Sequence, residues 1–302
     1  MNVVVVVGDV MNDVVVRPRC EMETGSDTDS EIRRVPGGSG ANQAAWLASL
    51  GIPVRFYGRA GVFDVDEHAE ALRRAGVDAR LAADREVPTG NIVVLVSSDG
   101  ERSMFTDRGA NRQLGAADLP RDLDGVAHVH VSGYALFEPP TREAVGAVID
   151  RAVRQSVPVS CDPSSESYLR RMGPERFLAV TAGVRTVFPN APEARLLARA
   201  DRGRVEDAAR ALTAHYPIVA VKLGRRGALL AERDAPTVRV EAPPATVVDT
   251  TGAGDAFCAG YLAAAWRGAA ALDAVRAGLE ASAGAVGHLG GRPELRDAAG
   301  DR

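Results

Sequence analysis

Two patterns of apolar residues alternate along the chain. Short runs rich in valine and isoleucine recur, and between them lie longer stretches in which apolar residues return every three or four positions. The first pattern is typical of strands covered on both faces, and the second of helices that bury one side. The runs occupy residues 3–7, 54–58, 126–132, 157–162, 185–188 and 218–223, and the helical stretches occupy residues 64–75, 141–155, 191–200 and 205–215. Their alternation predicts an α/β fold, a doubly wound and mostly parallel sheet flanked by helices.

Two segments interrupt this alternation. Residues 13–35 and 80–107 contain short alternating strand patterns and turn-like clusters such as TGSDTDS and SSDGERS, without a convincing helix. We expect them to pair as a small β lid that projects from the main body. Because no low-complexity linker or internal repeat divides the chain, we predict one domain over residues 1–302 with this lid.

Composition indicates an ordinary globular protein. Hydrophobic residues make up 46% of the 302 residues and charged residues 25%, with a formal net charge of -4. This balance gives no basic surplus for nucleic acid or anionic lipid, so we expect neither as a partner. The chain starts without a basic leader, and its most apolar later stretch, residues 256–266, is shorter than the ~20 residues of a membrane span. Cys20, Cys161 and Cys258 lack the spacing of a metal or redox site, so we expect reduced thiols in a cytoplasmic protein.

The most informative motif is VVDTTGAGDAFCAGYLAAAW, residues 247–266. A strand end is followed by a glycine-containing turn and then by a stretch apolar nearly all round, as expected for a buried helix. Gly252, Ala253 and Gly254 would lie at the helix start, where backbone N–H groups lack partners and the helix dipole favours negative charge. Small residues there let a phosphate approach the backbone, so the turn is suited to binding an anion.

Asp255 follows directly, in the first turn of the predicted helix. A carboxylate there is placed to accept a proton from an attacking hydroxyl while the amides hold a phosphoryl group. On these residues alone, an aspartate that only caps the helix is the favoured interpretation.

DTTGAGD resembles the C-terminal signature of the ribokinase-like (PfkB) carbohydrate kinases. The resemblance implies a ribokinase-like fold, with Asp255 as the catalytic base and the amides of Gly252, Ala253 and Gly254 as the anion hole. It also implies that Asp249 and Thr251 help to bind a monovalent cation, commonly potassium. The turn GGR at residues 290–292 stands where the family has its second cation-binding segment.

PGGSGANQAAWLASLG, residues 36–51, is similar to the N-terminal signature of the same family. Gly37 and Gly38 allow close approach of a polyhydroxy ligand, and the amide of Asn42 can donate and accept. A plain helix-start turn capped by Asn42 is the alternative. The resemblance implies that these residues bind substrate, together with Asp13 in GDVMNDVVV, for which Asp9 and Asn12 are close competitors.

Two further motifs point to the nucleotide. FPNAPEA resembles the NxxE pattern of the family, which implies that Asn190 lies near the phosphates and Glu193 organises Mg²⁺ through water. VKLGRRGALL looks like its nucleotide-binding turn, with Gly224 and Gly227 beside ATP. Lys222, the only lysine of the chain, would reach a phosphate as a compact charge. GxxxxGK[ST] occurs nowhere, so this is not a Walker A loop.

The family resemblance covers residues 8–293 but departs from ribokinase in detail. Ser39 replaces the usual lysine of GGKGAN, Met11 stands where ribokinases tend to have asparagine, and VSGYALF lacks their acidic residue. Met11, Tyr134 and Phe137 would instead form a more apolar wall that suits a nucleoside or modified sugar.

The sequence therefore predicts an ATP-dependent kinase acting on a primary hydroxyl of a small sugar or sugar derivative. A nucleoside kinase is the alternative, and a non-catalytic sugar or nucleotide sensor is a weaker one. An NAD-dependent oxidoreductase lacks its GxGxxG fingerprint. Because lids pair between subunits in relatives, we expect a homodimer formed through the lid.

Overall fold

The computed structural model describes residues 2–22, 24–96, 102–200 and 203–294. In this part of the chain nine strands form the main sheet. In spatial order they are β13 (Val238–Val240), β12 (Ala228–Glu232), β11 (Ile218–Lys222), β10 (Thr186–Val187), β9 (Val159–Asp162), β8 (Val126–Ser132), β1 (Val3–Val7), β4 (Val54–Gly61) and β5 (Asp78–Asp84). All neighbours from β11 to β5 are parallel, whereas β12 and β13 are antiparallel additions. The prediction of a mostly parallel sheet is confirmed.

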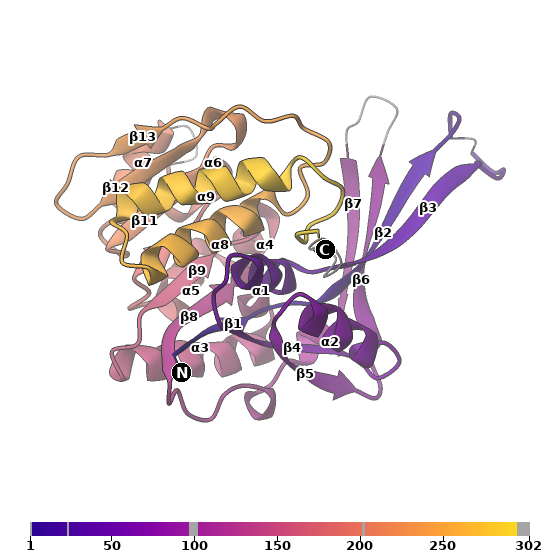
Figure 1. The fold of residues 1–302 in the computed structure, drawn as a ribbon, viewed down its shortest axis with the longest axis horizontal. Helices are drawn as coiled ribbons and strands as arrows, with labels where there is room; N and C mark the ends of the chain where they lie inside the picture. The colour runs from indigo at the N-terminus through magenta and orange to yellow at the C-terminus, as the bar shows by residue number, and fades with distance from the viewer. Residues whose placement is uncertain (1, 23, 97–101, 201–202, 295–302) are drawn as a thin grey trace, which may run out of the picture.

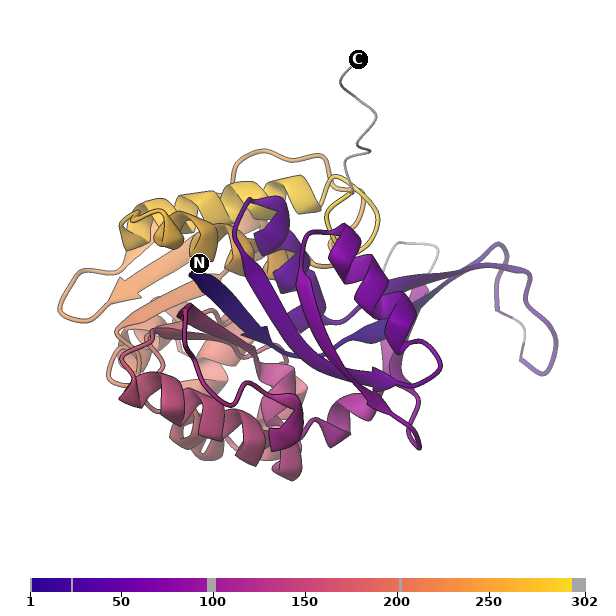
Figure 2. The ribbon, with the colours of Figure 1, turned by 60° about the horizontal axis from the view of Figure 1, so that its bottom comes forward.

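Helices cover both faces of the sheet (Figures 1 and 2). One face carries α1 (Ser39–Ser49), α2 (Val65–Arg74), α8 (Ala253–Trp266) and α9 (Ala271–Ala285). The other carries α3 (Pro139–Arg154), α4 (Glu166–Met172), α5 (Pro174–Val180), α6 (Ala191–Leu197) and α7 (Val205–Leu212). The central position of β1 explains its all-valine run. Val4 and Val6 pack in the hydrophobic cluster on the face covered by α1, α2, α8 and α9, and Val5 and Val7 pack in the cluster on the opposite face. Each layer thus buries alternate side chains of the same strands.

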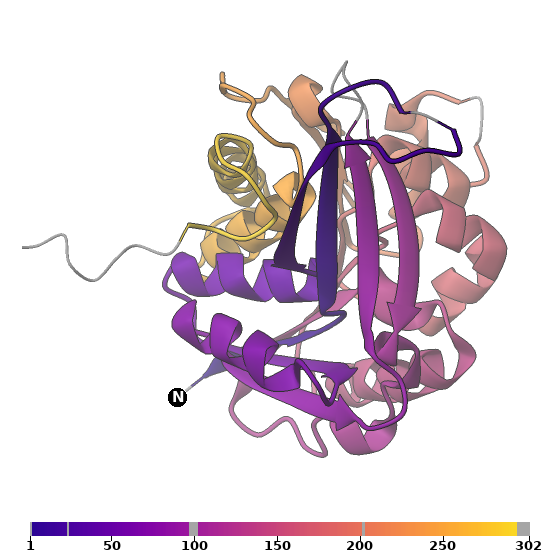
Figure 3. The same ribbon diagram turned by 90° about the vertical axis from the view of Figure 1, so that its right-hand side faces the viewer.

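A second, four-stranded sheet projects from one end of the molecule (Figures 1 and 3). Within the described residues its order is β3 (Ser30–Gly37), β2 (Met11–Pro18), β6 (Thr89–Val96) and β7 (Arg102–Gly109). We call this sheet the lid. Its strands come from the two segments singled out in the sequence, although residues 97–101 lie outside the described part.

Residues 80–84, which the sequence assigned to the lid, instead belong to β5 at the edge of the main sheet. Arg55 Nε donates to Asp78 at 2.8 Å and Arg59 Nε donates to Asp84 at 2.9 Å, so ion pairs join β5 to β4. Alternation of polar and apolar residues is common to a lid strand and an exposed edge strand, and for that reason it did not separate the two.

Element boundaries differ from the predicted ones by a few residues. The strand predicted at 157–162 begins at Val159, after Pro158, which has no N–H to donate. The helices predicted at 191–200 and 205–215 end at Leu197 and Leu212. Among the described helices, none is long and apolar enough to cross a membrane.

The parallel strands all run in the same direction, so their carboxyl ends lie along one side of the sheet. β1, β8, β9, β10 and β11 all end there, and the residues at or just after their ends include Asp9, Ser132, Asp162, Asn190 and Lys222. Helices α1 and α8 begin at the same edge. In open α/β sheets this edge is where ligands bind, so the fold brings the sequence-predicted residues to a common place.

Candidate active site

The turn before α8 has the geometry that its glycines predict. Gly252 is the N-cap of α8 in the left-handed conformation, with φ 74°. A Cβ at this position would lie 2.4 Å from the carbonyl oxygen of Gly291, so only glycine fits. Ala253, Gly254 and Asp255 form the first helical turn, whose N–H groups have no carbonyl four residues earlier within the helix.

Asp255 is held by two side chains from the start of α1. Ser39 Oγ donates to Oδ1 at 2.6 Å, and Asn42 Nδ2 donates to Oδ2 at 3.1 Å. Burial raises the pKa of Asp255 to about 7, and the hydrogen bonds from Ser39 and Asn42 oppose this rise. A carboxyl with a pKa near neutrality is suited to general base chemistry.

The GGSGAN segment brings Asn42 to that position. Gly38 is the N-cap of α1 with φ 94°, and a Cβ there would lie 2.6 Å from the carbonyl oxygen of Asp9. The helix start is therefore seated directly on the loop after β1. Asn42 is buried and bonds to Asp255 rather than capping its own helix, so the alternative interpretation of this segment is not supported.

Lys222 forms a buried ion pair with Asp162, a residue that the sequence did not single out. Its Nζ donates to both carboxylate oxygens, at 2.9 and 2.8 Å. Burial disfavours the ammonium, but the attraction of Asp162 outweighs it and raises the pKa of Lys222. A Cβ on Gly254 would lie 3.3 Å from Nζ. This fixed positive charge therefore lies against the first turn of α8.

Asn190 and Glu193 form a reciprocal cap at the start of α6. The Asn190 side chain accepts from the Glu193 N–H at 2.9 Å, while the Glu193 carboxylate accepts from the Asn190 N–H and from its Nδ2, both at 2.8 Å. Glu193 is only 1% exposed, and burial raises its pKa to about 7, with Lys222 opposing the rise. Both residues stand at the end of β10, beside the Lys222 strand.

These groups line one cleft, which we call the Asp255 cleft. It is lined by Ser39, Tyr134, Asp162, Ser164, Asn190, Glu193, Lys222, Gly224, Gly252, Gly254 and Asp255. Gly224 lines this cleft, and its place beside ATP stays a prediction. Gly227 does not line this cleft: its φ is 85°, and a Cβ would lie 1.9 Å from the carbonyl oxygen of Val240, so it is needed for the packing of β12 against β13.

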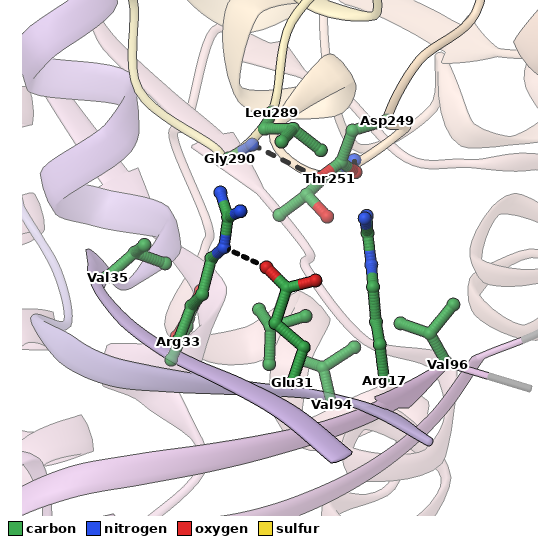
Figure 4. Close-up of a pocket in the computed structure, with 12 residues that line it drawn as sticks. Arg17, Glu31, Arg33, Val35, Val94, Val96, Asp249, Thr251, Leu289 and Gly290 are labelled. Atoms are coloured by element: carbon green, nitrogen blue, oxygen red, sulfur yellow. Dashed lines mark hydrogen bonds and ion pairs between the residues drawn. The ribbon is translucent and has the colours of Figure 1, made fainter. Parts of the chain in front are cut away.

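A second cavity, the lid pocket, lies between the lid and two loops of the main body (Figure 4). Its lining comprises Asp13, Val15, Arg17, Glu31, Arg33, Val35, Val94, Val96, Asp249, Thr251, Leu289 and Gly290. In Figure 4 the side chains of Arg17, Glu31 and Arg33 extend from the lid strands toward Asp249 and Thr251. Along the lid wall Val35 is paired with Asp13, Arg33 with Val15 and Glu31 with Arg17, so apolar and charged side chains are interspersed.

Asp249 joins the two loops expected to bind a monovalent cation. Its Oδ1 accepts from the N–H of Thr251 at 2.7 Å, and its Oδ2 accepts from the N–H of Gly290 at 3.1 Å. The binding of an ion there stays a prediction. Within the described residues, no group of three or more His, Cys, Asp and Glu residues could hold a metal. Mg²⁺ that keeps its waters and binds phosphates needs only one or two carboxylates, which the Asp255 cleft offers.

Two predicted wall residues lie elsewhere. Met11 is fully buried, and Phe137 stacks on Tyr168 with ring centroids 5.1 Å apart. Met11 instead fills space beside Gly90 and Asn111, because it is the first residue of β2, where the chain enters the lid. Of the three residues, Tyr134 alone lines the Asp255 cleft.

Four residues of the site were not predicted in the roles they take. Asp162 pairs with Lys222, and Gln43 donates to both Asp162 and Ser39, each at 3.2 Å. His130 contacts the Gln43 amide oxygen at 3.0 Å. Arg292 reaches Asn42 and Gly37 with its guanidinium. The signal available for Asp162 was a polar residue at the end of a buried strand. The contacts of Gln43 with Asp162 and His130, and those of Arg292, join distant segments and left no local pattern.

Comparisons with known proteins agree with this arrangement. A family model described as pfkB family carbohydrate kinase matches residues 1–298. A ribokinase from Arabidopsis thaliana is 30% identical over 307 residues, covering 97% of this chain and 78% of that protein. A cytidine kinase from Thermococcus kodakarensis is 28% identical over 275 residues, covering 89% and 94%. The crystal structure of an adenosine kinase from Sinorhizobium meliloti matches with a TM-score of 0.86 at 26% identity, covering 97% and 96%.

The match extends over nearly the whole chain, in sequence and in fold, and it includes every segment that contributes to the Asp255 cleft. This chain therefore belongs to the pfkB family of carbohydrate kinases, ATP-dependent enzymes that transfer a phosphoryl group to a hydroxyl group.

Proposed function

We propose that the enzyme transfers the γ-phosphoryl group of ATP to a primary hydroxyl of a small sugar or sugar derivative, with Asp255 as the base. One observation carries the proposal: Asp255 stands in the first turn of α8, beside Lys222, and Ser39 and Asn42 fix its carboxylate. A proton acceptor, an anion-binding helix start and a buried cation thus share one cleft.

Each group has a distinct task in this proposal. Asp255 Oδ2 or Oδ1 takes the proton of the acceptor hydroxyl as its oxygen attacks the γ-phosphorus in line. The N–H groups of Gly252, Ala253 and Gly254 hold the oxygens of the transferring group. Lys222 adds a fixed positive charge at the same place. Mg²⁺, bound with the nucleotide and organised by Glu193 through water, would neutralise the phosphates.

The lid pocket is the proposed site of the acceptor. Asp13 at its base offers a carboxylate to hydroxyl groups, and the lid would exclude water when it closes. Val15, Val35, Val94 and Leu289 also give the pocket an apolar wall. This wall favours the second candidate, a nucleoside whose base packs against the valines.

Replacing the base tests the central step. We expect Asp255→Asn to lower kcat by roughly 10²–10⁴-fold because an amide does not accept the proton. ADP release is to be measured with D-ribose, D-fructose, adenosine, cytidine and inosine, which also separates sugar from nucleoside kinases. Asp273→Asn, an exposed position on α9, is the matched control and should keep wild-type turnover.

The pH dependence gives an independent check. Asp255 must be ionised to act as a base, and its pKa is about 7, so kcat/KM should rise with pH and level off above about pH 7. A kcat/KM that is flat from about pH 5.5 to 8.5 would contradict the assignment. Asp255→Asn turnover equal to wild type would overturn it, and absence of ADP release from every acceptor would favour the sensor alternative.

Lys222 is proposed to contact the phosphates of ATP. We expect Lys222→Arg to raise the KM for ATP by about tenfold, or about 1.4 kcal/mol, because a planar guanidinium is larger than the ammonium that fits between Asp162 and Gly254. The KM for the acceptor should stay within about twofold of wild type. Unchanged ATP kinetics would remove Lys222 from the proposed nucleotide site.

The loops joined by Asp249 are proposed to bind a potassium ion. Turnover should then be higher in potassium chloride than in choline chloride at equal ionic strength, and Asp249→Ala should remove the difference. Equal rates of the wild-type enzyme in the two salts would exclude this part of the proposal.

A homodimer through the lid is the proposed assembly. The face of the lid opposite the pocket exposes apolar side chains that lie beside one another in the register: Ile32 is paired with Val16, and Phe105 with Val93. Ile32 is 64% and Phe105 63% exposed, and contiguous apolar patches of this kind favour association. Sedimentation should give a dimer for the wild type and a monomer for Ile32→Glu/Phe105→Glu, whereas a monomeric wild type would contradict the proposal.

A further inference from the structure

Arg292 turns inward from the GGR turn and contacts Gly37 and Asn42 at the start of α1. Its Nη2 donates to the carbonyl oxygen of Gly37 at 3.1 Å, and its Nε lies 3.4 Å from Asn42 Oδ1. Asn42 in turn donates to Asp255. The guanidinium is therefore linked to the base through one residue, Asn42.

Asp13 approaches Gly37 from another direction. Its side chain is 7% exposed and lines the lid pocket. A Cβ on Gly37 would lie 2.2 Å from Asp13 Oδ1, so the carboxyl rests against the bare Cα of this glycine. Asp13 and Arg292 thus converge on one residue, Asp13 at its Cα and Arg292 at its carbonyl group.

Each of the two side chains has one buried atom without a hydrogen-bond partner among the described residues. These atoms are Asp13 Oδ1 and Arg292 Nη1. Nor do the two groups form an ion pair with each other within the described part of the chain. Burial raises the pKa of Asp13 to about 7 and lowers that of Arg292 to about 10, and the charge of each residue opposes the shift of the other. A buried polar group left without a partner costs about 1–3 kcal/mol. Two such groups around one glycine indicate a place built for a polar ligand.

The chemistry of the two atoms restricts that ligand. A guanidinium N–H donates only, and a carboxylate oxygen accepts only. A hydroxyl group satisfies both, since its oxygen accepts from Arg292 while its hydrogen is donated to Asp13. An anionic group would satisfy Arg292 but would meet the carboxyls of Asp13 and Asp255, and an apolar group would satisfy neither.

We propose that Arg292 is a substrate-binding residue that, with Asp13, recognises a ring hydroxyl or a neighbouring pair of hydroxyls on the acceptor. The proposal rests on the acceptor site described above and adds that the acceptor is an uncharged polyhydroxy ring at this position. Arg292 selects the substrate and also holds Asn42, so it links recognition of the ring to the residue that orients Asp255.

The test combines a variant with substrates that lack single hydroxyls. Binding of D-ribose, D-fructose, adenosine and cytidine is to be measured by calorimetry without ATP, and turnover by ADP release. For each compound that binds, the 2-deoxy and 3-deoxy forms, or the 3-deoxy and 4-deoxy forms for fructose, are compared with the parent compound. We expect one of them to bind wild type at least tenfold more weakly, and Arg292→Met to lose most of this discrimination.

Kinetics should show the same selectivity. Arg292→Met should raise the KM for the acceptor at least tenfold while the KM for ATP stays near the wild-type value, because a binding contact to the acceptor is lost. Arg292→Lys, which keeps a cation and a donor, should recover part of the acceptor affinity. This variant replaces Arg292→Met in the test if the methionine variant does not fold. Arg276→Met, an exposed arginine on α9, is the control and should behave as wild type.

The outcomes separate this inference from the proposed function. If compounds bind and are phosphorylated but Arg292→Met keeps wild-type discrimination, or no deoxy form binds more weakly, the role of Arg292 is refuted alone. If compounds bind with Arg292-dependent discrimination but ADP is not released, the inference holds and the proposed reaction fails. If none of the four compounds binds to wild type, both are overturned.

Discussion

The starts of α1 and α8 lie face to face, and the hydrogen bonds between them define the site. Ser39 and Asn42 reach Asp255 across 216 and 213 residues of sequence. Close contact of α1 with β1 makes this possible, because a Cβ on Gly40 would lie 2.6 Å from the Cα of Gly8. Two helix N-termini thus direct positive potential to one place, while burial raises the pKa of Asp255 to about 7. The carboxyl is positioned rigidly and still able to exchange a proton.

A chain of hydrogen bonds from neutral donors supports Ser39, one of the two side chains that hold Asp255. The amide nitrogen of Gln43 donates to Ser39 and to the carboxylate of Asp162, which can only accept. The amide oxygen of Gln43 must therefore accept from His130 Nε2. Burial lowers the pKa of His130 to about 3, so the ring is neutral at pH 7 and carries one proton. Because Nε2 holds that proton, Nδ1 accepts from Ser160 Oγ at 2.7 Å. Every donor therefore points the same way, toward the site, without burying a further charge.

Much of the fold followed from local pattern, whereas the roles of the candidate site residues came from the resemblance to a known family. The valine run of β1 and the GAGD turn predicted a buried parallel strand and a helix start, and both are present in the structure. β5 was misassigned because an edge strand and a lid strand share one alternation. Asp162 and Arg292 could not be assigned because their roles come from partners on other strands and loops, Lys222 and Gly37, brought near only by the sheet order.

The charges of the Asp255 cleft centre on Lys222, the one lysine of the chain. Asp162 and Lys222 neutralise each other, and a Cβ on Gly254 would lie 3.3 Å from Lys222 Nζ, so the ammonium lies close to the first turn of α8. Glu193 and Asp255 remain, each with a pKa raised to about 7 by burial. At neutral pH the cleft is therefore partly negative before a polyphosphate enters. Because Lys222 is already paired with Asp162, the N–H groups at the start of α8 supply the remaining positive potential of the cleft, and a divalent cation bound with the nucleotide would add to it.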